Sequence, residues 1–218
     1  MKKGLTEMVF ILDRSGSMRG LEGDTVGGYN AMLEKQKNQE GEAIVSTVLF
    51  DDRFEVLHNR VSIKDAKPLS TQEYYVRGST ALLDAIGRAI RKIGYIQKNT
   101  PEADRDEKVV FVITTDGMEN ASHEFGYDDI KKMIEHQKEA YGWEFIFLGA
   151  NIDAVATAER VGIRADRSAN FHHDHRGTQM SYQSINDAIS DLRQKATISA
   201  EWKTEIDFDF TSRKPDEK

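Results

Sequence analysis

The stretch MVFILDRSGS, residues 8–17, is an apolar run that ends abruptly in polar residues. Its first half is apolar throughout and does not alternate with polar residues, which is typical of a strand covered on both faces. Asp13, Ser15 and Ser17 then place three oxygen-bearing side chains two residues apart. The pattern predicts a buried strand followed by a loop that carries these three oxygens.

Three further runs, at 43–50, 108–114 and 143–149, are also rich in β-branched and aromatic residues and predict buried strands. The run at 54–63 follows the first of these after only Asp51-Asp52-Arg53. A connection that short forms a hairpin, so 54–63 is predicted to be an antiparallel strand at the edge of the sheet, with the two aspartates in its turn. A short sixth strand is predicted near 169–171.

Helical patterns separate these strands, at 23–41, 79–96, 127–142, 153–162 and 179–196. Strands that alternate with helices imply right-handed crossovers. We therefore predict an α/β fold: a doubly wound, Rossmann-like, mostly parallel six-stranded sheet with one antiparallel edge strand and helices on both faces. We expect a single domain over 1–201 and a partly disordered C-terminal extension over 202–218. Within that extension, EIDFDF at 205–210 alternates in polarity and predicts an extra strand or extended segment.

Composition excludes several classes of function. The formal charge of −7 argues against a dedicated nucleic-acid surface, which normally carries a basic excess. The absence of cysteine excludes disulfides, thiolate metal sites and a cysteine nucleophile. No run approaches the roughly 18 apolar residues of a membrane span, and the N-terminal apolar run is too short for a signal peptide. We expect a cytoplasmic protein that contacts neither nucleic acid nor membrane.

In a doubly wound sheet, ligands bind at the carboxyl ends of the strands, where the strand order reverses. Asp13 ends the first strand, and Asp116 lies just after the strand at 108–114. If these strands are neighbours, the two carboxylates lie close together. Thr80 begins the helix at 79–96, whose N-terminus lies at the same edge because a crossover helix runs opposite to the strands.

The candidate ligands are therefore Asp13, Ser15, Ser17, Thr80 and Asp116. All of them offer oxygen, with no imidazole and no sulfur, and only two carry charge. Such a set suits Mg²⁺ better than zinc or copper, and Ca²⁺ or Mn²⁺ could substitute for Mg²⁺. Ser79 is interpreted as structural and Thr80 as the ligand, although their roles could be exchanged, and Asp84 is interpreted as a first-turn acid favoured by the helix dipole.

The motif D-x-S-x-S after the first strand, the G-S-T-A-L-x-D-A segment at 78–85 and T-D-G at 115–117 together resemble the von Willebrand factor A (vWA) domain. The resemblance covers roughly residues 7 to 195. It implies that the five side chains form a metal-ion-dependent adhesion site, to which a partner's acidic residue is often added. It also points to the stand-alone intracellular members found in bacteria, which serve as adaptors.

We therefore expect a non-enzymatic, Mg²⁺-dependent module that captures a Glu or Asp of a partner protein. The alternative is a Mg²⁺-dependent phosphohydrolase or phosphotransferase on a similar sheet. Against it, the residue two positions after Asp13 is Ser15, which cannot serve as a general acid at neutral pH. The sequence also lacks the G-x-x-x-x-G-K-[ST] and G-x-G-x-x-G phosphate-binding loops.

Two other segments carry weaker hypotheses. HHDHRG, which begins at His172 and includes Arg176, gathers three histidines and an aspartate that could bind a transition metal, although consecutive side chains point in different directions. A loop contact near the last strand is the favoured interpretation. In the segment Ile206–Phe210, Asp207 or Asp209 could supply a carboxylate to a neighbouring molecule's metal.

Overall fold

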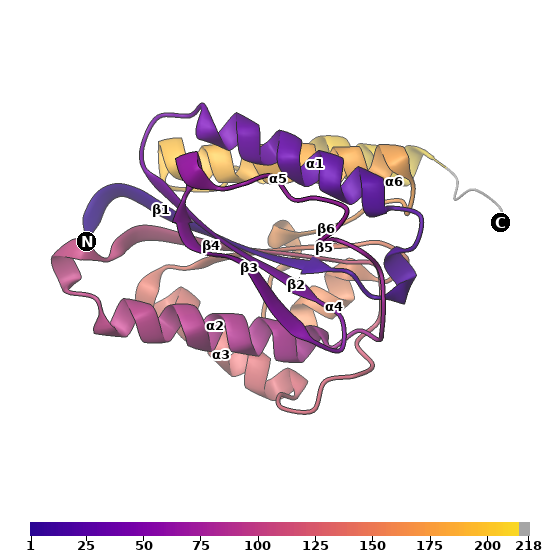
Figure 1. The fold of residues 1–218 in the computed structure, drawn as a ribbon, viewed down its shortest axis with the longest axis horizontal. Helices are drawn as coiled ribbons and strands as arrows, with labels where there is room; N and C mark the ends of the chain where they lie inside the picture. The colour runs from indigo at the N-terminus through magenta and orange to yellow at the C-terminus, as the bar shows by residue number, and fades with distance from the viewer. Residues whose placement is uncertain (214–218) are drawn as a thin grey trace.

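A computed structural model describes residues 1–213 of the chain and shows a six-stranded sheet in the order β3-β2-β1-β4-β5-β6 (Figure 1). All neighbouring strands pair in parallel except β2 and β3, which are antiparallel. The predicted fold class is therefore confirmed. The strands are β1 (Lys2–Asp13), β2 (Ala43–Phe50), β3 (Phe54–Ser62), β4 (Asp106–Thr115), β5 (Glu144–Gly149) and β6 (Ser168–Asn170).

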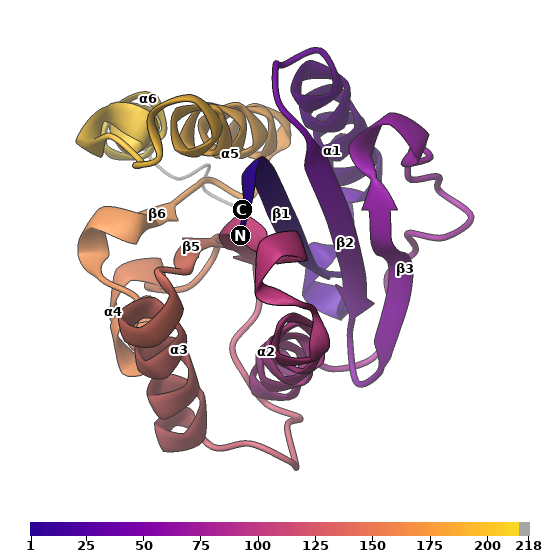
Figure 2. The same cartoon turned by 90° about the vertical axis from the view of Figure 1, so that its left-hand side faces the viewer.

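Within the described residues, six α-helices cover the two faces of this sheet. Helices α1, α5 and α6 lie on one face, and α2, α3 and α4 lie on the other (Figure 2). Their bounds are α1 (Glu22–Lys37), α2 (Leu82–Asn99), α3 (Tyr127–Tyr141), α4 (Ala154–Arg160), α5 (His175–Lys195) and α6 (Thr204–Ser212). Within residues 1–213, none of these helices is both long and apolar enough to cross a membrane.

Strand β1 contributes to a hydrophobic core on each side of the sheet. Met8, Phe10 and Leu12 belong to the core beneath α1 and α5, while Val9 and Ile11 belong to the core beneath α2 and α3. Successive side chains of a strand point to opposite faces, so a strand inside two cores must be apolar at every position. This double burial explains why the run at 8–12 shows no alternation.

The β2–β3 hairpin forms as predicted, with Asp51 in its turn. The Asp51 carboxylate accepts a hydrogen bond from the backbone N–H of Arg53 at 2.7 Å. In the sheet formed by residues 1–213, strand β3 pairs with β2 alone and forms one edge. On the other side of β1, strand β4 pairs with it in parallel, with Leu12 opposite Thr114. The strand order thus reverses next to β1, which is where ligands bind in such sheets.

The predicted extended segment at 205–210 is wrong, because these residues lie in helix α6. The two apolar residues Ile206 and Phe208 do not share a face: Ile206 is buried, whereas Phe208 is 69% exposed. The buried residues are instead Trp202, Ile206 and Asp209, which follow helical spacing. The single domain over 1–201 and the partly disordered extension both stay predictions, and the end of that extension, 214–218, lies outside the described residues.

Candidate metal site

The structure brings the predicted hydroxyl groups together at the carboxyl edge of the sheet. The Ser15 and Ser17 hydroxyl oxygens lie 2.9 Å apart, and the Thr80 hydroxyl donates to the Ser15 hydroxyl at 3.0 Å. Ser15 and Thr80 are buried, whereas Ser17 is exposed. The exposed Ser79 has no part in this hydrogen-bonded group, so Thr80 is the residue that faces the site. The three hydroxyls come from two loops that are far apart in the sequence.

The two predicted carboxylates lie at the same edge of the sheet as these hydroxyls. Asp13 is the last residue of β1, and Asp116 directly follows β4. Both side chains are almost fully buried. Asp13 accepts hydrogen bonds from the Ser15 backbone N–H at 2.7 Å and from the Thr115 hydroxyl at 2.5 Å. Thr115 was missed from the sequence, although its place directly before Asp116 puts it at the same strand end.

The electrostatics of the pair favour a cation. Burial raises the pKa of Asp13 to about 6, the hydrogen bonds from Thr115 and Ser15 oppose this increase, and the charge of Asp116 adds to it. Two carboxylates in a buried setting repel each other unless a cation lies nearby. His173 Nδ1 lies 3.5 Å from Asp116 Oδ2, so an imidazole also reaches the edge of the site.

Gly117 leaves space among the hydroxyls of Ser15, Ser17 and Thr80. A Cβ atom at this position would lie 2.8 Å from both the Ser17 and the Thr80 hydroxyl oxygens, and 3.6 Å from that of Ser15. Real Cβ contacts are almost never shorter than 3.0 Å. The space above Gly117 is therefore lined by three side-chain oxygens and would be filled by any other residue type. The T-D-G motif is visible in the sequence, but the sequence does not show that its glycine leaves this space open.

The loop after β4 holds Thr80 in place. The Asn120 side-chain oxygen accepts from the Thr80 backbone N–H at 2.9 Å, and the Asn120 backbone N–H donates to the Thr80 carbonyl at 3.0 Å. Glu119 accepts from the backbone N–H of Leu83 at 2.9 Å, at the start of α2. Glu119 and Asn120 therefore join the two loops of the site. Helix α2 begins at Leu82, so Thr80 lies two residues before it and not in its first turn.

The histidine segment does not form a site of its own. His172 contacts the Phe210 carbonyl, His175 contacts Asp24, and Asp174 pairs with Arg213. Within residues 1–213, no three side chains of the types His, Cys, Asp and Glu are grouped so that they could hold a metal. A metal centre in this part of the chain would thus need hydroxyl ligands, as the Asp13 edge offers.

The donor chemistry of this edge fits a hard divalent cation. The five predicted side chains offer only oxygen, two of them are carboxylates, and the three hydroxyls surround a space that Gly117 keeps open. Mg²⁺ prefers such oxygen ligands and retains several waters. Asp13, Ser15, Ser17, Thr80 and Asp116 are the residues that would hold it.

No protein-family model matches the sequence, and no curated protein matches it. Solved structures do share the fold. Proximal thread matrix protein 1 from the mussel byssus aligns at 13% identity over 87% of this chain and 46% of its own, with a TM-score of 0.58. The pilus adhesin SpaC from Lactobacillus rhamnosus GG aligns at 12% identity over 88% of this chain and 30% of its own, with a TM-score of 0.64.

A von Willebrand factor type A protein from Catenulispora acidiphila aligns at 15% identity over 84% of this chain and 42% of its own, with a TM-score of 0.58. The chain thus spans less than half the length of each of these three proteins. At such low identity the likeness concerns the fold alone. Together with the strand order and the antiparallel β3, it shows that this chain has a vWA-like α/β fold.

Proposed function

We propose that this chain is a non-enzymatic protein-binding module that holds Mg²⁺ at the carboxyl edge of its sheet. Asp13, Ser15, Ser17, Thr80 and Asp116 would hold the ion, and Ca²⁺ or Mn²⁺ could replace it. A Glu or Asp of a partner protein would complete the set of ligands. The observation that carries the proposal is the cluster of three hydroxyls around the space at Gly117, at the sheet edge that also holds two buried carboxylates.

The charge balance supports capture of one acidic group. Two carboxylates neutralise a divalent cation, and a partner's carboxylate would be attracted by the ion itself. Closing the interface would exclude water and strengthen this attraction, since electrostatic interactions grow as the local dielectric constant falls. The overall charge of −7 would oppose a polyanion such as nucleic acid more than it opposes a single carboxylate. Action as a stand-alone cytoplasmic adaptor belongs to the same proposal.

Metal binding is tested first on the chain alone. Titration of Mg²⁺ and Mn²⁺ by isothermal calorimetry should show one site in the natural chain and none in the Ser15→Ala/Ser17→Ala variant. Ser79→Ala is the matched control. Ser79 is exposed and adjacent to Thr80, but it is not hydrogen-bonded to the hydroxyls of Ser15, Ser17 and Thr80. Equal affinity in the natural chain and the double variant would contradict the ligand set.

Capture of a partner is tested by a pull-down with and without EDTA, repeated with the double variant. A partner that binds the natural chain in Mg²⁺ but is lost both in EDTA and with the double variant supports the proposal. A partner that is retained in EDTA and with the double variant shows that no metal mediates the contact. A phosphatase screen in Mg²⁺ examines the enzymatic alternative. Turnover that the Asp13→Ala variant abolishes would replace the binding module by a phosphohydrolase.

A further inference from the structure

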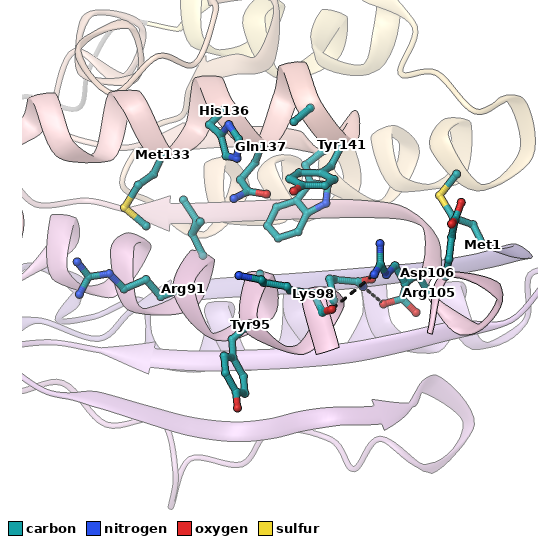
Figure 3. Close-up of a pocket in the computed structure, with 16 residues that line it drawn as sticks. Met1, Arg91, Tyr95, Lys98, Arg105, Asp106, Met133, His136, Gln137 and Tyr141 are labelled. Carbon is teal, nitrogen blue, oxygen red and sulfur yellow. Dashed lines mark hydrogen bonds between the residues drawn. The ribbon is translucent and has the colours of Figure 1, made fainter. Parts of the chain in front are cut away.

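A second concave surface lies at the opposite end of the strands from the candidate metal site. It is a groove of about 930 Å³ between α2 and α3 (Figure 3). Its lining includes Asp106, the first residue of β4, and Trp143, which directly precedes β5, so it lies at the amino ends of these strands. The buried residues Ile90 and Trp143 give it an apolar floor. Nothing in the proposed metal chemistry uses this groove.

Large apolar side chains remain exposed at this groove. Tyr95 on α2 is 71% exposed and Tyr141 at the end of α3 is 60% exposed, and both line it. Met133 of α3 adds a partly buried thioether. Clusters of exposed apolar groups on a soluble protein mark interaction surfaces more often than isolated ones do. The groove therefore has the floor and walls of a docking site.

The charges of the groove select an acidic occupant. Arg91, Lys98 and Arg105 line it, and none of them forms an ion pair with another residue of 1–213. Of the two acids in the lining, Asp106 is already paired with Arg60 at 3.0 Å, which leaves Glu102. The side chains that line the groove therefore carry a net positive charge, although the net charge of the whole chain is −7.

The same chain carries a surface of matching chemistry on α6. Phe208 is 69% exposed, and the exposed Glu205, three residues earlier in α6, shares its helical face. An aromatic anchor with a carboxylate beside it is what an apolar groove with a cationic rim accommodates. We call this surface the α6 face.

We propose that the α6 face of one copy of this chain docks in the α2–α3 groove of a second copy. A copy cannot fill its own groove, because α6 and the α2–α3 pair cover opposite faces of the sheet (Figure 2). The Phe208 ring enters between the two helices, and the carboxylate of Glu205 faces the cationic rim. This is the mode in which a helix lies in a groove and a few apolar anchors supply the affinity.

Because the two surfaces differ, the contact is head-to-tail. Every copy that uses its α6 face still has its groove available, so copies can add to either end. One short helix buries less area than the roughly 1,600 Å² of a standard stable interface. We therefore expect weak association that rises with protein concentration and falls with salt, since added ions screen exposed charges.

Sedimentation of the full chain, from micromolar to millimolar concentration and in EDTA, tests the proposal without any contribution of the metal site. Phe208→Ala and Tyr95→Glu should each weaken association about tenfold or more, as loss of an aromatic anchor does. The Phe208 and Tyr95 side chains are mostly exposed, so both variants should keep the fold. Circular dichroism checks this. Met118→Ala is the control, because Met118 is equally exposed but lies next to the Asp116 edge.

Mixing the two variants gives the sharper result. Each variant alone should stay monomeric at concentrations where the natural chain associates, but Tyr95→Glu retains an intact α6 face and Phe208→Ala retains an intact groove. An equimolar mixture should therefore form a one-to-one dimer and no larger species. A natural chain that stays monomeric to millimolar concentration overturns the proposal. Variants that associate like the natural chain, or a mixture that stays monomeric, overturn it as well.

Discussion

The Arg14 guanidinium donates from Nε to Asp51 Oδ2 at 3.0 Å, and both side chains are completely buried. This ion pair joins the loop of Ser15 to the β2–β3 turn, which itself contacts the segment before α2. The Arg14 carbonyl accepts from the backbone N–H of Arg77 at 3.0 Å, and the Asp51 carbonyl accepts from that of Ala81 at 2.9 Å. Thr80, between these two positions, is thereby fixed next to Ser15. Arg14 acts on the site by positioning, because its side chain bonds to Asp51, Glu55 and the Glu73 carbonyl and to none of the three hydroxyls.

Asp51→Asn should destabilise the fold by about 3–5 kcal/mol, because it leaves the buried Arg14 charge without its buried partner. Burial alone would raise the pKa of Asp51, but hydrogen bonds from Arg77 and Arg53 and the charge of Arg14 bring it below its usual value. Urea denaturation measures the loss. The control is Glu55→Gln, which removes the other carboxylate on Arg14 but at a side chain 56% exposed, and should cost about 0–1 kcal/mol. Equal losses would contradict the role given to the buried pair.

Gly117→Ala should weaken Mn²⁺ and Mg²⁺ binding while the fold remains intact. The added Cβ would lie 2.8 Å from the hydroxyl oxygens of Ser17 and Thr80, so these side chains must move apart. Calorimetric titration measures the affinity, and circular dichroism checks the fold. Gly27→Ala in α1 is the matched control, since no atom lies within 4 Å of its added Cβ. Unchanged metal affinity in Gly117→Ala would show that this space is not where an ion is held.

Asp84→Ala should release the loop that follows Gly117. The Asp84 carboxylate accepts from the backbone N–H groups of His123, Glu124 and Phe125 at 3.0, 2.9 and 3.1 Å. Its loss leaves three donors to find other partners, at a cost of about 2–4 kcal/mol. Hydrogen exchange of these three amides should become faster, and exchange in β6 should not. Asp128→Ala is a suitable control, because Asp128 is also a first-turn acid of a helix, but of α3. Equal protection in the natural chain and Asp84→Ala would rule out this anchoring.

The sequence predicted those parts of the molecule that depend on neighbouring residues. The strand at 8–12 and the oxygens that follow it are adjacent in the chain, so periodicity and strand order placed Asp13 and Asp116 at one edge. Long-range partners were not predictable in this way. The partner of Arg14 is 37 residues away, and Asp84 accepts from backbone groups about 40 residues further on, so both residues looked like ordinary loop or helix-start positions. Helix α6 was missed because its alternating pattern mimics a strand until the burial of Trp202 is known.

A last prediction concerns pH and the central strand. Glu7 on β1 is fully buried beside Arg60, Gln97 and Asp106. Burial raises its pKa to about 8, Asp106 adds to the increase, and the charge of Arg60 opposes it. The folded chain therefore binds a proton at neutral pH that the unfolded chain, with a Glu pKa of 4.5, has released.

The contribution of Glu7 to stability is complete below pH 4.5 and is lost as pH rises toward 8, by up to about 1.4 kcal/mol per pH unit. Glu7→Gln keeps the uncharged shape, so its free energy of unfolding, measured in urea from about pH 5 to 8, should fall less steeply than that of the natural chain. Parallel profiles for the two proteins would show that Glu7 is already ionised in the fold.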